Sequence, residues 1–140
     1  MNLSIKITLA ASGVFLFAGL IGGILKYRGI MSSANHKAPP YIDVAHRASF
    51  MYSFAALVMA ELLKFSPYSE QVQLIITSIP LFFFAMTIGQ YFKLSIQNKV
   101  TNQLSERNFN TTWGILLLII GEIGGVGAIV WGFISTQLFV

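Results

Sequence analysis

The sequence contains no cysteine. Disulfide bonds, cysteine-ligated zinc, thiolate ligation of haem and cysteine-based catalysis are therefore excluded. A tightly bound metal ion would depend on His36 or His46, on the methionines and tyrosines, or on the few carboxylates. The range of possible metal and redox chemistry is correspondingly narrow.

Charged residues are also scarce. They make up 10% of the 140 residues, against about 25% in ordinary globular domains, whereas hydrophobic residues make up 55% and the mean hydropathy is +0.71. This composition indicates an integral membrane protein in contact with lipid. The net charge is +4, but the basic residues lie in short loops between apolar runs. That placement is typical of membrane orientation signals, so we expect no nucleic-acid partner.

Several enzyme motifs are missing as well. The chain has no Gly-rich phosphate loop, no G-x-S-x-G, no H-E-x-x-H and no paired C-x-x-C. Neither Glu61 nor Glu122 has a second carboxylate at the spacing of a metal site or a hydrolase. Dehydrogenase, kinase and zinc-hydrolase functions therefore have little support.

Four apolar segments remain, and each approaches the roughly 20 residues that cross a bilayer as a helix. We predict an all-α fold in which residues 1–140 form one four-helix transmembrane domain, present in an oligomer. The first segment is longer than the apolar part of a signal peptide and has no small-residue cleavage pattern, so we expect it to be retained. The predicted spans are 6–25, 48–65, 72–92 and 112–138.

The breaks between the spans predict how they connect. Ser66-Pro67-Tyr68-Ser69 predicts a tight turn, and hence an antiparallel hairpin of spans two and three. Pro80 lies inside span three, where a membrane helix can tolerate the lost hydrogen bond. Asn110-Thr111-Thr112 offers candidate N-caps for span four.

The distribution of Lys and Arg predicts the orientation. Two lie in the N-terminal tail and the second loop, and seven lie in or beside the first and third loops. We therefore expect a multi-pass protein of the bacterial inner (cytoplasmic) membrane, with loops 26–47 and 93–111 in the cytoplasm and both termini outside. The two are Lys6 and Lys64, and the seven are Lys26, Arg28, Lys37, Arg47, Lys93, Lys99 and Arg107.

Glycine pairs mark expected helix contacts. Gly19 and Gly23 in span one, and Gly121 and Gly125 in span four, each form a G-x-x-x-G spacing. This spacing places two small residues on one face and lets helix backbones approach closely. We expect spans one and four to pack tightly, either together or across subunits.

A stripe of residues on span two is the main candidate site. Helical spacing places an imidazole first, followed by small or hydroxyl-bearing residues. Either a flat cofactor or a neighbouring helix would fit against such a stripe. Neutral imidazole is a good ligand for haem iron, and the chain offers no better one; alternatively, the imidazole is an interfacial polar group that pairs with Asp43 or a lipid headgroup. The stripe consists of His46, Ser49, Phe50, Ser53, Leu57 and Ala60.

Other intramembrane polar residues are also candidates. Arg47 could bind a propionate, a lipid phosphate or Asp43, or extend to the interface as an end-of-helix arginine. Tyr91 is expected at a depth similar to His46, where it could donate a hydrogen bond or belong to the aromatic belt. Glu122 lies about ten residues into span four. It would be neutral and hydrogen-bonded, paired with a base, or part of a proton path.

The arrangement resembles the styrene oxide isomerase and hydroxylaminobenzene mutase family of small four-span membrane proteins. The resemblance rests on chain size, four spans, Ala45-His46 opening span two, and Ile88-Gly89-Gln90-Tyr91 late in span three. It implies a homotrimer with haem b at the subunit interfaces and His46 as the axial ligand and metal-binding residue. It also implies an epoxide-to-aldehyde rearrangement in which ferric iron acts as a Lewis acid on a small hydrophobic substrate.

Carried over by position, Tyr91 matches the family's active-site tyrosine. Tyr52 stands where the isomerases have an asparagine, and Phe83 where they have an aspartate. We therefore expect Tyr91 and Tyr52 as catalytic residues, and Arg47, Ser49, Phe50 and Ser53 beside His46 as cofactor-binding residues. Two other classes remain open: a small non-catalytic assembly subunit of a membrane complex, and an oligomeric proton-coupled transporter that uses Glu122.

Overall fold

The computed structural model describes residues 1–99, 101–105 and 107–139. Over this part of the chain the secondary structure is helical, with no strand, which confirms the predicted all-α fold. A single π-helical turn, η1, runs directly into the last helix. The elements are α1 (Leu3–Ser32), α2 (Pro40–Leu63), α3 (Glu70–Gln97), η1 (Asn110–Gly114) and α4 (Ile115–Gln137).

Three of these helical segments are long and apolar enough to cross a membrane: Leu3–Ser32, Glu70–Gln97 and Asn110–Gln137. The second helix, α2, does not reach the same measure of hydropathy, since it carries charged residues near both ends. It also begins eight residues before the predicted span 48–65, so His46 and Arg47 lie within the helix. The crossing predicted for 48–65 stays a prediction.

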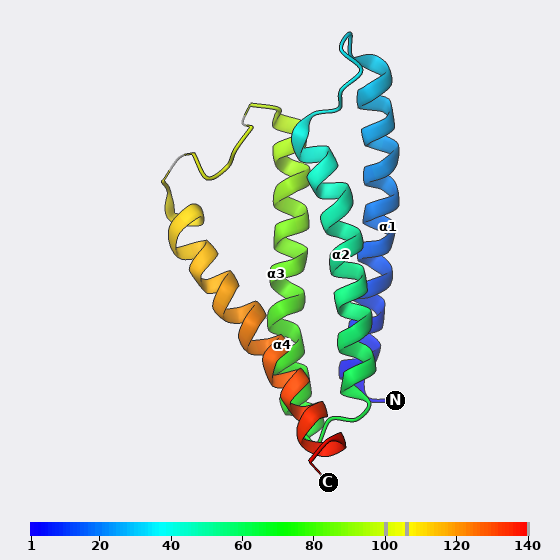
Figure 1. The fold of residues 1–140 in the computed structure, drawn as a ribbon, viewed down its shortest axis with the longest axis vertical. Helices are drawn as coiled ribbons and strands as arrows, with labels where there is room; N and C mark the ends of the chain where they lie inside the picture. The colour runs from blue at the N-terminus through cyan, green and yellow to red at the C-terminus, as the bar shows by residue number, and fades with distance from the viewer. Residues whose placement is uncertain (100, 106, 140) are drawn as a thin grey trace.

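The helices run alternately up and down (Figure 1). The first three lie side by side, with the most extensive contact between α1 and α2. The C-terminal end of α4, the last helix, lies against α3. Toward its own N-terminal end, α4 diverges from α3. Both ends of the chain lie at one end of the bundle. The loop 33–39 and the described residues between α3 and η1 lie at the other, which is the arrangement that the predicted topology requires.

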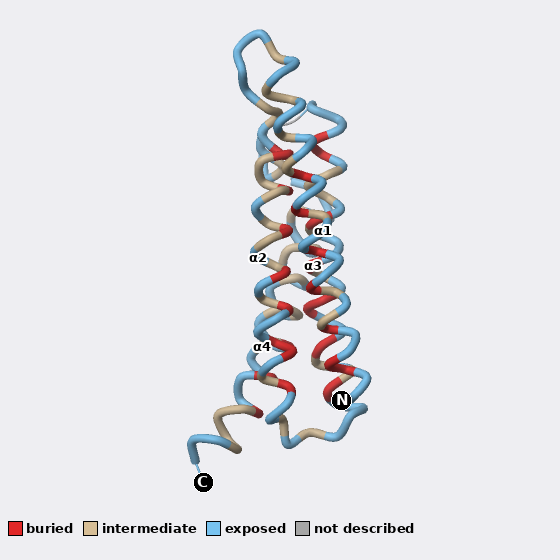
Figure 2. The backbone as a smooth tube through the Cα atoms, turned by 90° about the vertical axis from the view of Figure 1, so that its right-hand side faces the viewer, coloured by how far each residue is buried: buried red, intermediate tan, exposed pale blue. Residues whose placement is uncertain are grey.

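Buried positions lie mainly where α1, α2 and α3 face one another, whereas α4 has only three (Figure 2). Five of the seven buried residues of α1 are Ser, Thr or Gly, which lets the backbones of α1 and α2 approach closely. Ser12 and Ser53 link the two helices reciprocally: each hydroxyl donates to the other residue's backbone carbonyl, at 2.9 and 2.8 Å. An apolar core that includes Met59, Leu81 and Phe84 joins α2 to α3.

The two glycine pairs contact different helices from those expected. Gly19 and Gly23 face α2, where added Cβ atoms would lie 3.0 Å from Phe50 and His46 respectively. Gly121 and Gly125 face α3 instead, and α1 does not contact α4 within the described residues. Packing of spans one and four against each other within one chain is therefore wrong, while their pairing across subunits stays a prediction.

Pro80 and Gly125 explain the close approach of α3 and α4. Proline has no N–H, so Pro80 leaves the carbonyl of Ile76, four residues earlier, without its helical partner. A Cβ added at Gly125 would lie 2.6 Å from that carbonyl oxygen and 2.6 Å from Cδ of Pro80. Only glycine leaves room for α4 at this point. The interior proline is thus accommodated by a matching glycine on the neighbouring helix.

The turn between α2 and α3 lies where the sequence predicts it, whereas the last helical segment begins earlier than predicted. Residues 66–69 form the expected turn between α2 and α3, and Ser69 caps α3 by accepting a hydrogen bond from the N–H of Val72 at 3.5 Å. The predicted caps at Asn110-Thr111-Thr112 are wrong, because these residues already lie in the helical turn η1. The side chain of Asn108 instead accepts from the N–H of Thr111 at 3.0 Å.

Candidate functional site

The imidazole of His46 is held by the first helix. Its Nδ1 atom lies 2.8 Å from the backbone carbonyl oxygen of Gly19. A carbonyl oxygen can only accept a hydrogen bond, so Nδ1 carries the proton of this bond. In the neutral ring the lone pair then resides on Nε2, which has no hydrogen-bond partner among the described residues. The alternative of a pair between His46 and Asp43 is not observed.

Glycines on α1 make room for this contact. A Cβ at Gly23 would lie 3.0 Å from Cε1 of His46, and one at Gly22 would lie 3.2 Å from its Cα. On the other side, Phe50 presents its ring edge-on to the imidazole, with 5.0 Å between centroids and 75° between planes. The half-buried ring is therefore confined on two sides by α1 and Phe50.

The predicted stripe on α2 divides into exposed and enclosed parts. The Ser49 hydroxyl donates to the carbonyl of Ala45 at 2.7 Å and is fully buried. Ser53 is bonded to Ser12, and Leu57 points outward with 47% of its surface exposed. Both hydroxyls are engaged within the helix packing, and the prediction of Ser49 and Ser53 as cofactor-binding residues stays a prediction.

Arg47 belongs to a small charge cluster. Asp43 accepts from Nζ of Lys26 at 2.5 Å and from the guanidinium of Arg47 at 2.9 Å. Asp43 lies before the apolar part of α2, and the hydrogen bond from Lys26 holds the pKa of its carboxyl below the usual range; partial burial opposes this, and the charges of Lys26, Arg47 and His46 add to it. The Arg47 side chain is 70% exposed, so one face of its guanidinium is open to an external anion.

Tyr52 and Tyr91 lie away from His46. The ring of Tyr52 stacks on Phe84 of α3, with 4.2 Å between centroids, and Tyr91 stacks on Tyr41 of α2 at 6.1 Å. No hydrogen bond or ring contact joins either tyrosine to His46 in the described part of the chain. The structure thus places the predicted site residues in two groups: His46 and Phe50 against α1, and the tyrosines between α2 and α3.

Two contributors to these groups escaped the sequence interpretation. The carbonyl of Gly19 is a backbone group, so no side-chain pattern marks it. Tyr41, in contrast, precedes Tyr52 by eleven residues, which is about three helical turns. The two tyrosines therefore share one face of α2 and could have been linked. The hydroxyl oxygen of Tyr41 also accepts from the N–H of Gln103 at 2.6 Å, which ties the third loop to α2.

Glu122 is the remaining candidate, and its environment differs from the simplest expectation. Its Oε1 atom is buried and has no hydrogen-bond partner among the described residues. The expected neutral, hydrogen-bonded carboxyl is therefore not observed for this oxygen. Glu61, in contrast, pairs with Lys64 at 2.5 Å, as its spacing allows.

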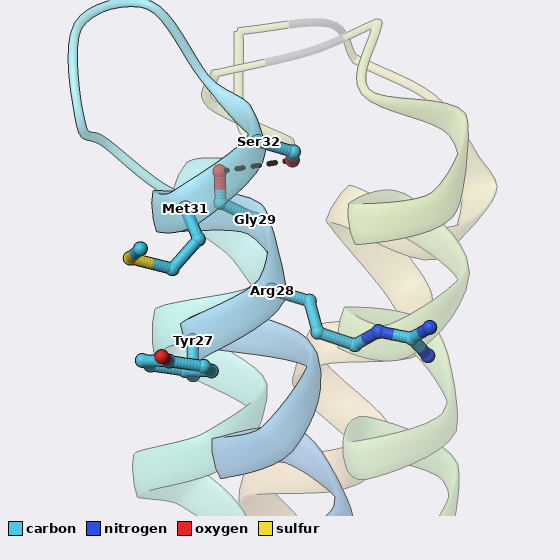
Figure 3. A pocket seen from close by; sticks show the side chains of 5 residues that line it. All are labelled: Tyr27, Arg28, Gly29, Met31 and Ser32. Atoms are coloured by element: carbon cyan, nitrogen blue, oxygen red, sulfur yellow. Dashed lines mark hydrogen bonds between the residues drawn. The ribbon is translucent and has the colours of Figure 1, made fainter.

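Two surface recesses lie at the loop end of the bundle. One, of about 510 Å³, is lined by a single turn of α1 (Figure 3). Within it Arg28 points away from Tyr27 and Met31, so these side chains do not converge on a common point. A second, of about 490 Å³, lies along the first loop between Gly29 and Pro40 and reaches Asn98. Neither includes His46 in its lining.

The described residues contain no group of three or more His, Asp or Glu side chains that could surround an ion. Haem iron requires only one axial ligand from a chain, because the porphyrin supplies four nitrogens. Comparisons of the chain with known protein families, with curated proteins and with solved structures found no match.

Proposed function

We propose that the protein is an integral membrane protein that binds haem b through Nε2 of His46. The observation that carries this proposal is the hydrogen bond from Nδ1 of His46 to the carbonyl of Gly19. Histidines that ligate metals commonly donate their other ring N–H to a carbonyl or carboxylate, which fixes the tautomer and the ring orientation.

The neighbouring residues fit the same use. Phe50 provides an apolar ring beside the imidazole, and the exposed guanidinium of Arg47 suits a carboxylate such as a haem propionate. A haem bound at His46 would need a further apolar surface to cover it, because one chain confines the imidazole on two sides only. A homo-oligomer, and a trimer by resemblance, would supply that surface.

The chemistry proposed for this site is the rearrangement of a small hydrophobic epoxide to a carbonyl compound. Ferric haem, when bound, supplies a Lewis acid. The part of this chain is to hold the cofactor at His46 and to offer the hydroxyls of Tyr91 and Tyr52 as donors to a developing oxyanion. Neither tyrosine makes a ring contact with the His46 of its own chain among the described residues, so we propose that they serve the site of a neighbouring subunit.

The membrane setting completes the proposal. All four helices would cross the bacterial inner membrane, with α2 as the least apolar, packed against the other helices. Seven of the basic residues would then lie near the cytoplasmic face at the loop end, where the cluster of Lys26, Asp43 and Arg47 would meet the headgroups. This arrangement places His46 just inside the apolar region.

The visible absorption spectrum of the purified protein tests the proposal. We expect a Soret band that is lost in His46→Ala and restored when imidazole is added to His46→Gly. The matched control is His36→Asn, because His36 lies in the first loop with a φ of 53°, a conformation that asparagine tolerates. A colourless protein after expression with sufficient haem would refute the proposal. The assembly-subunit function would then be favoured.

A further inference from the structure

The loop end of the bundle carries most of the positive charge of the chain. Seven of the nine Lys and Arg residues lie in or beside its loops, and Asp43 is the only acid there among the described residues. Asp43 is already shared by Lys26 and Arg47. Arg28 and Lys37 form no ion pair within the described part of the chain. This end of the bundle therefore attracts anions, and its charge is not neutralised from within.

A recess of about 490 Å³ opens beside Lys37. Three parts of the fold line it: the last turn of α1, the first loop with the start of α2, and the residue that follows α3. Because these parts are far apart in the sequence, the recess is a product of the helix packing. Its lining consists of Gly29, Ser32, Ser33, Asn35, Lys37, Ala38, Pro39, Pro40 and Asn98.

The depth of this recess corresponds to lipid headgroups. The apolar part of α1 ends at Leu25, and a helix rises about 1.5 Å per residue, so Gly29 lies about 6 Å beyond the apolar part. In the membrane placement proposed above, the polar layer on each side of the hydrocarbon core is about 5–8 Å thick. The recess thus begins within the headgroup layer and opens toward the cytoplasm.

The helix ends around the recess favour an anion. The carbonyl ends of α1 and α3 are partly satisfied within the chain: the Ser33 hydroxyl donates to the carbonyl of Ile30 at 3.4 Å, and the N–H of Asn98 donates to that of Leu94 at 3.0 Å. The start of α2, in contrast, has Pro39 as its N-cap and no side-chain cap. The uncapped start of a helix carries partial positive charge. It adds to the full charge of the neighbouring lysine.

The first loop holds Lys37 in position. Its N–H donates to Oγ of Ser33 at 2.9 Å and to Oδ1 of Asn35 at 3.1 Å, and the N–H of His36 donates to the carbonyl of Ser33 at 3.1 Å. A loop that is already ordered loses less entropy when a ligand binds. The side-chain amide of Asn98 makes no hydrogen bond in the described structure and can donate to an oxygen of the ligand.

The last turns of α1 add an apolar surface next to this recess. Arg28 and Ser32 extend to one side of the helix, and Tyr27 and Met31 to the other (Figure 3). The apolar side continues toward the bilayer centre at a spacing of three and four residues, with every side chain more than half exposed: Leu20, Ile24, Tyr27 and Met31. A molecule with both a charged group and an acyl chain can contact both sides, whereas a soluble anion can use only the charged one.

We propose that the recess between the ends of α1 and α3 and the start of α2 binds the headgroup of an anionic phospholipid. Lys37 and Arg28 neutralise its phosphate, and an acyl chain lies along the exposed apolar side of α1. The proposal rests on the membrane placement in the proposed function but not on haem. A colourless protein that keeps its lipid preference would refute haem binding and leave this site standing.

Native mass spectrometry of the full chain, released from detergent, measures the bound lipid. The probes are phosphatidylglycerol and phosphatidylcholine with the same acyl chains. We expect phosphatidylglycerol to be retained at several times the occupancy of phosphatidylcholine, and a large excess of glycerol 3-phosphate not to displace it. Equal occupancy of the two lipids refutes the proposal. Displacement by glycerol 3-phosphate would assign the recess to a soluble phosphate and overturn the lipid as its occupant.

Variants locate the site. Lys37→Gln and Arg28→Gln change exposed side chains, so both should fold, and each is expected to lower the occupancy of phosphatidylglycerol about fivefold. The matched control is Lys93→Gln, because Lys93 is an exposed base at the same end that lines neither recess. It should retain the lipid as the unaltered chain does. Equal losses in Lys37→Gln and Lys93→Gln would show general attraction to a positive surface and refute a defined site.

Discussion

Nδ1 of His46 on α2 lies 2.8 Å from the carbonyl oxygen of Gly19 on α1. This relationship assigns the ring proton to Nδ1 and leaves Nε2 for another partner. It also makes the orientation of the imidazole depend on how closely α1 and α2 approach. Substitutions on α1 should therefore alter the orientation of the His46 imidazole, even though they change no residue on α2.

Gly23→Ala tests this dependence. The new Cβ would lie 3.0 Å from Cε1 of His46, so the imidazole or the helix must shift, and we expect reduced haem content with a changed Soret band. The measurement is the ratio of haem absorbance to protein. Gly13→Ala is the matched control, because nothing lies within 4 Å of its Cβ. Unchanged haem content in Gly23→Ala would contradict the role given to the α1 contact.

Gly125→Ala should weaken the contact between α3 and α4. Its Cβ would lie 2.6 Å from the Ile76 carbonyl oxygen, a backbone atom that cannot move without distorting α3. We expect a loss of about 1–3 kcal/mol in the free energy of unfolding, measured by denaturation in detergent. Gly124→Ala is the control at the preceding position. Nothing lies within 4 Å of a Cβ added there, so this change should have little effect on the folding of a single chain.

Ser53→Ala separates packing from cofactor binding. It removes the bond to the Ser12 carbonyl at 2.8 Å and leaves the Ser12 hydroxyl bonded to a backbone oxygen. We expect a loss of about 0.6 kcal/mol, up to about 1.7, as for hydrogen bonds between membrane helices, with an unchanged haem spectrum. A double-mutant cycle with Ser12→Ala measures the coupling. A shifted spectrum with unchanged stability would indicate that Ser53 contacts the cofactor.

The Asp43 cluster predicts a dependence of stability on pH. Because its pKa is lower in the folded protein than its usual value of about 3.9, Asp43 contributes stability above that value. The contribution is lost as the pH falls through the lowered folded pKa. We therefore expect destabilisation below about pH 4, measured by thermal unfolding, and a smaller effect in Asp43→Asn. Glu61→Gln is the control, since the ion pair of Glu61 is largely exposed.

Much of the fold could be predicted from local patterns. Long apolar runs predicted the helices, and Ser66-Pro67 predicted the turn between α2 and α3. The helix start near Asn108 was misplaced, because several Asn and Thr residues in succession offer equivalent caps. The glycine pairs correctly indicated close helix contacts, but glycine carries no information about which helix will approach it.

The sequence by itself determined that this chain is helical and apolar, and that few of its residues can carry chemistry. Those features depend on composition and on spacing along the chain. The tertiary structure alone decided that His46 forms a hydrogen bond with α1, that Tyr52 stacks on Phe84 and Tyr91 on Tyr41, and that Oε1 of Glu122 is buried without a hydrogen-bond partner among the described residues. These depend on how helices rotate and pair, which small differences in packing among similar apolar faces select.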